Sequence, residues 1–325
     1  MPSFSTTTKD EISKLELKSK CCLRAEIAAI IQMSGSLSIS GGGISLKVTT
    51  ENASIARRIF NLLKVIYEVH SDIVVRKNRQ LKKNNSYMIN VEGSEKVEHI
   101  LRDIEVLRDR ESIYYGLSNR ISPNIVKDRC CKRAYIRGAF LGGGSISNPE
   151  RTYHFEFITN DDEYSKDLSE LVNSFGLKSK VVTRKDYYIV YIKEGEQVVD
   201  LLNIMGAHNA LLRLEDIRVL KEMRNNINRI VNCETANLAK TINASLRQIK
   251  KIEFIDNTMG IENLPENLKE IARLRIENQD ASLKELGELL SPPVGKSGVN
   301  HRLRKLEEIA DELSEGGKRV DRENC

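Results

Sequence analysis

Tryptophan is absent from this 325-residue chain, and aromatic residues make up only 5% of it. Long apolar runs are missing too: no stretch approaches the roughly 18 residues that a membrane-spanning helix needs. The N-terminal sequence MPSFSTTTKDEISKLELKSK lacks the apolar core of a secretory signal peptide. We therefore expect no membrane association, a cytoplasmic location, much helix and small hydrophobic cores.

Familiar metal and cofactor motifs are also missing. The five histidines, at positions 70, 99, 154, 208 and 301, lack the spacing of zinc ligands. The glycine runs at 41–43 and 142–144 are not followed by the Gly-Lys-Ser/Thr of a phosphate loop, so we interpret them as tight turns. Four of the six cysteines form adjacent pairs, at 21–22 and 130–131, without Cys-x-x-Cys spacing. We interpret them as small core residues in a reducing compartment, and expect no metal or cofactor.

Charged residues are plentiful, at 30% of the chain, and the net charge is +5. The basic excess lies in the N-terminal third, where residues 1–120 carry 19 Lys and Arg against 14 Asp and Glu. This balance is compatible with a nucleic-acid partner but does not establish one. The densest basic run comprises Arg76, Lys77, Arg79, Lys82 and Lys83.

An internal repeat organises the first two-thirds of the chain. Residues 21–40 read CCLRAEIAAIIQMSGSLSIS, and residues 130–148, at an offset of 109, read CCKRAYIRGAFLGGGSISN. Fainter matches follow in the same order, including 50–52 with 160–162 and Arg76-Lys77 with Arg184-Lys185. An ordered series of this kind predicts two structural repeats, at about 20–110 and 129–205.

Each repeat is predicted to have the order αββαββα. A motif helix ends at a Gly-Ser turn, and the strands and helices that follow are set by periodicity. The expected helices are 52–67, 95–107, 162–175 and 195–205, and the expected strand pairs are 73–77 with 87–91 and 179–184 with 187–193. Small residues line one side of both motif helices, which allows close approach. We expect these helices to pack together about a pseudo-twofold axis, with each repeat's four strands joined in one curved sheet.

The last third is predicted to be helical. A connecting helix at 209–232 and a further helix at 234–254 precede a loop at 257–265 and a helix at 265–277. Ser282 and Glu285 form the S-x-x-E pattern of a capping box, which opens a helix at 283–290 that Pro292-Pro293 ends. Ser297 is the predicted N-cap of the final helix.

The final helix has an apolar stripe at positions 299, 303, 306, 310 and 313. Its first two turns carry donors suited to base edges and phosphates on the other side, and acidic residues follow only later. An ordinary amphipathic helix with a solvated face is the alternative. The residues expected to contact DNA are Lys296, Ser297, Asn300, His301, Arg302, Arg304 and Lys305.

The repeat pattern resembles the LAGLIDADG homing-endonuclease fold, through Gly35-Ser36 and Gly144-Ser145. More specifically, the chain is similar to the WhiA family of sporulation regulators and cell division proteins. The resemblance is carried by CC-x-R-A-x-I…GGGSISNP, RNNINRIVNCETANLAKT and PPVGKSGVNHRLRKLEEIA, and it covers nearly the whole chain. It implies an α+β fold: a degenerate LAGLIDADG-like domain at 1–205, a connecting helix at 206–232, and an all-α DNA-binding domain at 233–325 with a helix-turn-helix at about 281–314.

The resemblance also bears on catalysis. In LAGLIDADG nucleases the residue before the motif's glycine is an acid that holds a divalent metal, and the matching positions here are Ser34 and Gly143. Glycine has no side chain, and a lone serine is a weak magnesium ligand. Gln32 and Leu141, nearby, cannot substitute. We therefore expect no DNA cleavage and no enzyme activity.

The basic run of repeat one is expected at and beyond a strand end, with Arg184 and Lys185 in the corresponding place of repeat two. Paired basic strand ends would suit phosphates on two turns of DNA. A solvated hairpin tip remains the alternative, particularly because Asp186 adjoins the second pair.

These residues and the resemblance predict a nucleoid-associated, sequence-specific double-stranded DNA-binding protein. It would act as a transcription regulator or as a factor in cell division and chromosome segregation, with other transcription or division proteins as further partners and no small-molecule substrate. An active, magnesium-dependent homing nuclease and a protein-interaction module are the competing hypotheses.

Overall fold

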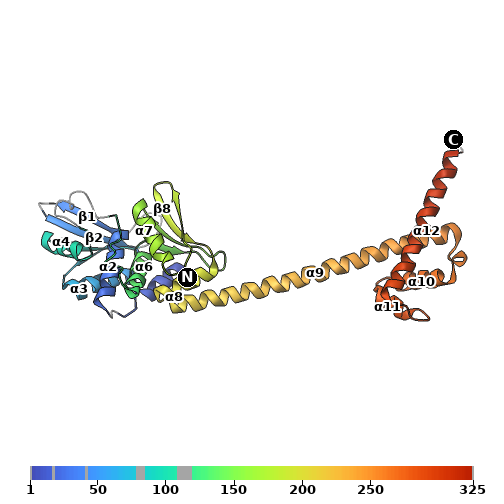
Figure 1. Ribbon diagram of the computed structural model, residues 1–325, viewed down its shortest axis with the longest axis horizontal. Coiled ribbons are helices and arrows are strands. Elements are labelled where there is room, and N and C mark those ends of the chain that lie inside the picture. Colours follow the sequence, from blue (N-terminus) through green and yellow to red (C-terminus); the bar gives the residue numbers. More distant parts are fainter. Residues whose placement is uncertain (1, 17–18, 41–42, 78–84, 108–118, 324–325) are drawn as a thin grey trace. The chain divides into compact units, whose positions relative to one another are not determined.

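The computed structural model describes residues 2–16, 19–40, 43–77, 85–107 and 119–323, with side chains as far as residue 314 (Figure 1). The chain divides into two compact units, Met1–Lys221 and Glu222–Cys325. No helix within the described ranges is long and apolar enough to cross a membrane.

The first unit contains the two predicted repeats, and the order αββαββα is confirmed in both. A short helix, α1 (Phe4–Ile12), precedes them. Repeat one comprises α2 (Lys20–Ser34), β1 (Gly35–Ser40), β2 (Gly43–Thr50), α3 (Ala53–Tyr67), β3 (Asp72–Lys77), β4 (Asn85–Glu92) and α4 (Ser94–Asp103). Repeat two comprises α6 (Arg129–Gly143), β5 (Gly144–Ile146), β6 (Phe155–Thr159), α7 (Asp162–Asn173), β7 (Lys180–Arg184), β8 (Tyr187–Ile192) and α8 (Gly195–Met205).

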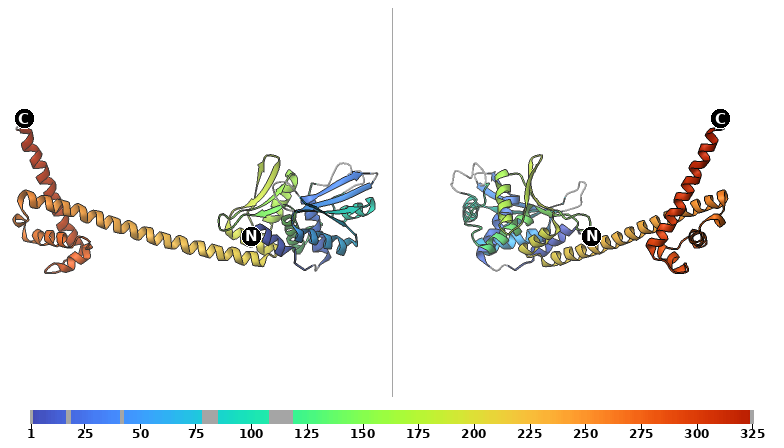
Figure 2. Two further views of the ribbon diagram at one scale, coloured as in Figure 1. Left: turned by 180° about the vertical axis from the view of Figure 1, so that it is seen from behind. Right: turned by 45° about the vertical axis from the view of Figure 1, so that its right-hand side comes forward.

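Each repeat forms its own four-stranded antiparallel sheet, as expected, with the orders β1-β2-β4-β3 and β5-β6-β8-β7. The motif glycines begin both sheets in the same register, Gly35 opposite Val48 and Gly144 opposite Phe157. Alternate residues of the inner strands are buried, because one face of each sheet packs on the helices. Figures 1 and 2 show both sheets on one side of the α2–α6 pair.

The two motif helices pack closely against each other, as their small residues predicted. A Cβ atom added at Gly138 would lie 2.2 Å from the carbonyl oxygen of Glu26, and one at Gly142 would lie 2.7 Å from the Cβ of Met33. Both helices are almost fully buried along their middle turns. Only glycine on α6 allows this backbone separation, so the pseudo-twofold helix pair is the centre of the first unit.

Equivalent arginines fasten each motif helix to the end of its repeat. The Arg24 guanidinium donates from Nε to the carbonyl oxygen of Asp103 at 2.6 Å, at the last residue of α4. Arg133, which is 109 residues later, donates to the carbonyl oxygens of Ile204 and Asn203 at 2.8 and 3.0 Å, near the end of α8. A positively charged side chain is stabilised near the C-terminal end of a helix, where the helix dipole is negative. The two repeats therefore share this arginine contact as well as their order of helices and strands.

A buried ion cluster joins the repeats. Glu26 on α2 has no exposed surface, and its carboxylate accepts hydrogen bonds from two arginines, Arg58 at both oxygens and Arg137 at Oε2. The Nε of Arg58, on α3, lies 2.8 Å from Oε1, and the Nε of Arg137, on α6, lies 2.9 Å from Oε2. Arg58 also donates to the backbone carbonyl of Leu15, and Arg137 to that of Met205. This cluster links α2 to its own repeat and to the other.

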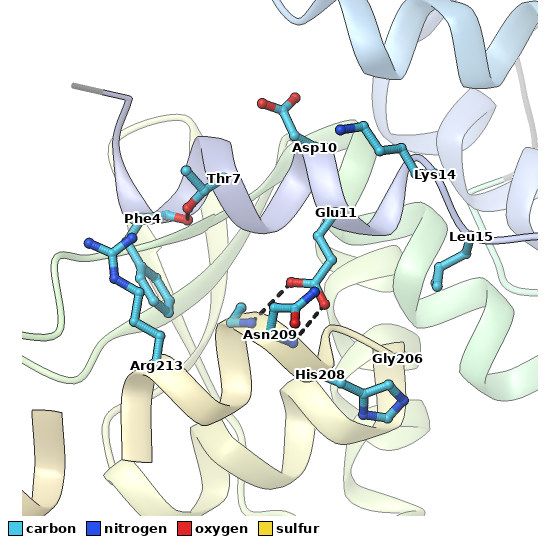
Figure 3. A pocket seen from close by; sticks show the side chains of 11 residues that line it. Phe4, Thr7, Asp10, Glu11, Lys14, Leu15, Gly206, His208, Asn209 and Arg213 are labelled. Atoms are coloured by element: carbon cyan, nitrogen blue, oxygen red, sulfur yellow. Dashed lines mark hydrogen bonds between the residues drawn. The ribbon is translucent and has the colours of Figure 1, made fainter. Parts of the chain in front are cut away.

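Helix α1 holds the start of a long helix, α9 (His208–Met259). The Glu11 carboxylate accepts hydrogen bonds from the backbone N–H groups of Asn209 and Ala210 at 2.8 and 3.0 Å (Figure 3). These groups have no intrahelical acceptor in the first turn of a helix, and a negative charge is favoured there. The contact borders a cavity of about 640 Å³, lined also by Phe4 and Arg213.

Burial of Lys9 on α1 gives a testable pH dependence. Burial lowers the pKa of its ammonium group from 10.5 to about 8, and the nitrogen lies 5.4 Å from the centre of the Phe140 ring. Between pH 8 and 10.5 the unfolded chain therefore binds more protons than the folded chain does. The free-energy cost of burying this group falls, and the folded state becomes more stable, as pH rises through that window. Relative to a Lys9→Met variant, the parent chain should gain about 2 kcal/mol of unfolding free energy between pH 7 and 10.

Urea unfolding of the parent and Lys9→Met chains at the two pH values measures this difference, and other titrating groups cancel between the chains. A constant difference across the window would contradict the prediction.

The second unit contains the last part of α9, a 3-10 turn (Ile261–Asn263), α10 (Glu266–Glu277), α11 (Leu283–Leu289) and α12 (Lys296–Glu323). The predicted break near residue 233 is wrong: α9 is one helix of 52 residues that ends at Met259, beyond the predicted start of the loop. No proline or glycine occurs between 207 and 259, so nothing in the chain stops the helix. Conversely, α4 ends at Asp103, four residues early, because Glu105 has a positive φ of 56°.

The cysteines also differ from expectation. Cys131 is buried, but Cys21 and Cys130 are exposed and Cys22 is intermediate. The interpretation of both pairs as small core residues is therefore wrong for most of them.

Candidate nucleic-acid interface

Helices α10, α11 and α12 share one hydrophobic core in the second unit. Ile271, Leu286, Val299 and Leu303 have between 0% and 1% of their surface exposed, and Ile252 and Ile255 of α9 belong to the same cluster. Helices α10 and α11 are short and have little apolar surface each, so packing against each other and α12 supplies the stability that neither has alone.

Arg275 fixes the connection between α10 and α11. Its side chain is buried, and its Nη1 donates to the carbonyl oxygen of Ala281 at 2.8 Å and to that of Gln279 at 3.4 Å. Burial lowers the pKa of this guanidinium. One charged group therefore satisfies several carbonyls of the loop that would otherwise lack partners.

The predicted capping box at the start of α11 is confirmed. The backbone N–H of Glu285 donates to Ser282 Oγ at 3.3 Å, and the N–H of Ser282 donates to the Glu285 carboxylate at 2.7 Å. These bonds lower the pKa of Glu285. The helix then ends at Leu289, one residue before its predicted end and three before Pro292.

The turn between α11 and α12 crosses α11 at a glycine. The Val294 N–H donates to the carbonyl oxygen of Gly287 at 2.9 Å. A Cβ at Gly287 would lie only 2.1 Å from the Val294 carbonyl oxygen and 3.2 Å from Cγ2 of Val299. A glycine is therefore required for the turn and α12 to pack on α11.

Helix α12 begins two residues earlier than a Ser297 N-cap predicts. Lys296 is its first residue, and the Val299 N–H donates to the carbonyl oxygen of Gly295 at 3.1 Å. Ser297 therefore lies in the first turn, and its prediction as the N-cap is wrong. The apolar stripe is confirmed: Val299, Leu303, Leu306 and Ala310 are buried, and Leu313 packs against the same core.

The residues predicted to contact DNA form the outward side of the first turns of α12. Lys296, Ser297, His301, Arg304 and Lys305 are exposed, whereas Asn300 and Arg302 are intermediate. Lys305 forms an ion pair with Glu308 at 3.2 Å. Among the described residues, the other six side chains have no hydrogen bond or ion pair, so their donors are available to a ligand.

The basic strand ends occupy equivalent places in the two sheets. Arg76 and Lys77 end the edge strand β3, Arg184 ends the edge strand β7, and all three are exposed. Lys185 follows in the turn to β8, with a positive φ of 55°. The other members of the run, Arg79, Lys82 and Lys83, lie outside the described residues.

The ends of the motif helices carry no carboxylate. The Ser34 hydroxyl donates to the carbonyl oxygen of Ile30 at 2.9 Å, within its own helix. A Cβ at Gly143 would lie 2.3 Å from the methyl carbon of Met33 and 3.0 Å from the carbonyl oxygen of Ile158. The Met33 side chain therefore fills the space that a residue at position 143 would need.

Sequence reasoning missed Arg275 and Gly287, which set the α10–α11–α12 geometry. Gly287 could have been found from the sequence, because a glycine inside a short predicted helix indicates that another segment packs closely against it. Nothing in the sequence indicates the role of Arg275, because its acceptors are backbone carbonyls, which every residue has.

The fold and these surfaces define a two-repeat LAGLIDADG-like domain followed by a helix-turn-helix domain. Comparison with known families gives the same division. Residues 20–107 match the WhiA N-terminal LAGLIDADG-like domain, residues 132–224 the WhiA LAGLIDADG-like domain, and residues 227–310 the WhiA C-terminal HTH domain. The chain belongs to the WhiA family.

Relatives match over nearly their full length. The chain is 56% identical to the probable cell division protein WhiA of Alkaliphilus metalliredigens, over 95% of this chain and 98% of that one. It is 57% identical to the protein of the same name from Clostridium beijerinckii, over 96% and 98%. The crystal structure of full-length DUF199/WhiA from Thermatoga maritima is similar, with a TM-score of 0.59, 26% identity, and coverage of 96% and 99%.

Proposed function

We propose that this chain binds double-stranded DNA sequence-specifically through the first two turns of α12. The observation that carries the proposal is a set of donors that are exposed or partly exposed, all but Lys305 unpaired among the described residues, on the other side of α12 from its buried apolar stripe. A helix held this way by two others can enter the major groove, where such donors reach base edges and phosphates. The helix start at Lys296 adds the positive end of the helix dipole.

The bound DNA is left uncut. Phosphodiester cleavage of this kind needs carboxylates that hold hard cations beside the phosphate. The Ser34 hydroxyl donates its hydrogen bond within its own helix, and the Met33 side chain occupies the space next to Gly143. The first unit then acts as a scaffold, and the exposed basic ends of β3 and β7 give it weak phosphate contacts.

Related proteins carry names that indicate the biological setting. The two relatives described above are named probable cell division proteins. Together with a helix-turn-helix domain, this supports a regulator of transcription, or a factor in cell division and chromosome segregation, that works on the nucleoid in the cytoplasm.

Removal of the Arg304 guanidinium tests the proposal. Arg304→Ala should weaken binding of the full chain to its selected duplex about ten-fold, because one groove contact contributes on the order of 1–3 kcal/mol. Arg273→Ala is the matched control: it removes an exposed arginine of α10 that pairs with Glu262, outside the predicted face. Binding is measured by fluorescence anisotropy across a salt series, with and without Mg²⁺.

The outcomes separate the hypotheses. Loss on selected but not on random duplexes indicates base readout, whereas equal loss with a shallower salt dependence indicates a phosphate contact. Nicking of the duplex with Mg²⁺ would restore the nuclease hypothesis. Equal affinities of the Arg304→Ala, Arg273→Ala and parent chains would remove α12 from the interface and favour a protein-interaction role.

A further inference from the structure

The two cysteine pairs, far apart in sequence, come together at one end of the motif-helix pair. Cys21 and Cys22 lie in the first turn of α2, and Cys130 and Cys131 lie in the first turn of α6. The four Sγ atoms all lie within 4.8 Å of one another. Among the described residues, this is the only group of three or more side chains with metal-ligand atoms gathered in this way.

The spacing of the sulfurs fits a single tetrahedral ion. A zinc–thiolate bond is about 2.3 Å long, so the sulfurs of a tetrahedral site stand about 3.8 Å apart. The Sγ atoms of Cys130 and Cys131 are 3.9 Å apart. All four thiols are free, and they are far from the S–S distance of about 2.05 Å in a disulfide. The cysteine ligands of a polynuclear iron–sulfur cluster bind different iron atoms and therefore stand further apart than these four sulfurs do.

The starts of the two helices favour negative charge on the sulfurs. Both cysteine pairs occupy the second and third residues of a helix, where backbone N–H groups point outward. Ser19 and Asp128 precede these helices, and within the described residues neither forms a side-chain capping bond. Other helices of the same unit, α3 and α7, do have capped first turns, through Asn52 and Asp161. The first turns of α2 and α6 therefore leave their positive ends directed at the thiols.

The thiols themselves differ in proton affinity. The Ser19 hydroxyl, 2.9 Å from Cys21 Sγ, lowers the pKa of Cys21. Burial raises the pKa of Cys22 to about 11 and also raises the pKa of Cys131. A bound cation would displace these protons, as it does at thiolate sites generally.

Basic side chains adjoin both pairs. Lys20 and Arg129 directly precede them, and Lys132 follows the second pair. The site is open to solvent at Cys21 and Cys130, so an ion can enter. Cys22 and Cys130 also border a cavity of about 440 Å³ that reaches Arg133 and His208.

We propose that Cys21, Cys22, Cys130 and Cys131 together bind one zinc ion, which clamps the first turns of the two motif helices to each other. The site is structural, because four protein ligands fill the tetrahedron and leave no open position for chemistry. It joins the two repeats at one end of the helix pair, while the Glu26 cluster joins them further along α2.

Metal content of the full chain, purified with a thiol reductant and without chelator, tests the proposal. Mass spectrometry of the elements should find about one zinc per chain. Replacement by Co²⁺ should give thiolate-to-cobalt charge-transfer bands and the visible bands of tetrahedral cobalt. The double variant Cys22→Ser/Cys130→Ser should lose both signals, and Cys233→Ser is the matched control, because that exposed cysteine of α9 is outside the cluster.

A measurement on the unaltered chain keeps the test independent of folding in the variants. Bound zinc should protect the four clustered cysteines from alkylation while Cys233 reacts, and should raise the Tm by about 5 °C. Three results would overturn the proposal: no metal in the folded, reduced chain; equal cobalt spectra in the double variant and the control; or a disulfide between the two pairs in place of metal binding.

Discussion

The Glu26→Gln variant is expected to lose about 4 kcal/mol of unfolding free energy, enough to leave the first unit barely folded. Glutamine keeps the shape of the side chain but removes its charge. Arg58, with a nearly buried side chain, and Arg137 would then remain in the interior without a counter-ion. An unpaired buried charge is far more costly than the loss of a surface ion pair. Urea unfolding followed by circular dichroism measures the change.

Two further variants make this prediction specific. Glu163→Gln removes an exposed carboxylate that pairs with Arg120 at 2.9 Å, and should cost less than about 1 kcal/mol. The triple change Glu26→Leu, Arg58→Met and Arg137→Met removes all three charges and should recover most of the lost stability. If Glu26→Gln behaves like Glu163→Gln, the cluster contributes little and our account of it is wrong.

The Gly287→Ala variant is expected to abolish measurable DNA binding while the first unit stays folded. The added methyl carbon would lie 2.1 Å from the backbone carbonyl oxygen of Val294, so the turn and α12 must move away from α11. Overpacking against backbone costs about 3 kcal/mol, and here the element displaced is the one that carries Arg304. Hydrogen exchange of the second unit and anisotropy with the selected duplex measure the two effects.

Gly295→Ala is the control for this variant. Gly295 lies in the same turn, and no described atom lies within 4 Å of an added Cβ, so alanine should fit there without displacement. Binding by Gly287→Ala that equals binding by Gly295→Ala would show that the turn adapts and that the close contact is unimportant.

Much of the first unit could be predicted from sequence because it is a repeat. A pattern that occurs twice separates signal from chance, and helices α2 and α6 even share their boundaries at the offset of 109. The apolar stripe of α12 was equally clear, because periodicity determines which face is buried. The capping box at Ser282 was visible because both partners lie within one turn.

The errors fall where distant residues decide the structure. The cysteines were predicted to be small core residues because each pair alone lacks ligand spacing, and only the packing of α2 on α6 brings the two pairs together. The helix break expected near Cys233 is absent, because no proline or glycine lies there to interrupt the helix. Arg275 and the residues predicted to contact DNA could be placed on their helices, but the carbonyls that Arg275 binds depend on the tertiary fold.

The Glu26 cluster has one more consequence, because it breaks the symmetry of the two repeats. At the offset of 109, Glu26 corresponds to Tyr135 and Arg137 corresponds to Ala28. If two first repeats paired, Ala28 would stand in the place of Arg137, and Glu26 would have no arginine across the axis. A pair of second repeats would bury arginines without a carboxylate. Each half therefore favours its unlike neighbour over a copy of itself, which disfavours pairing of two first repeats or two second repeats from different chains during folding.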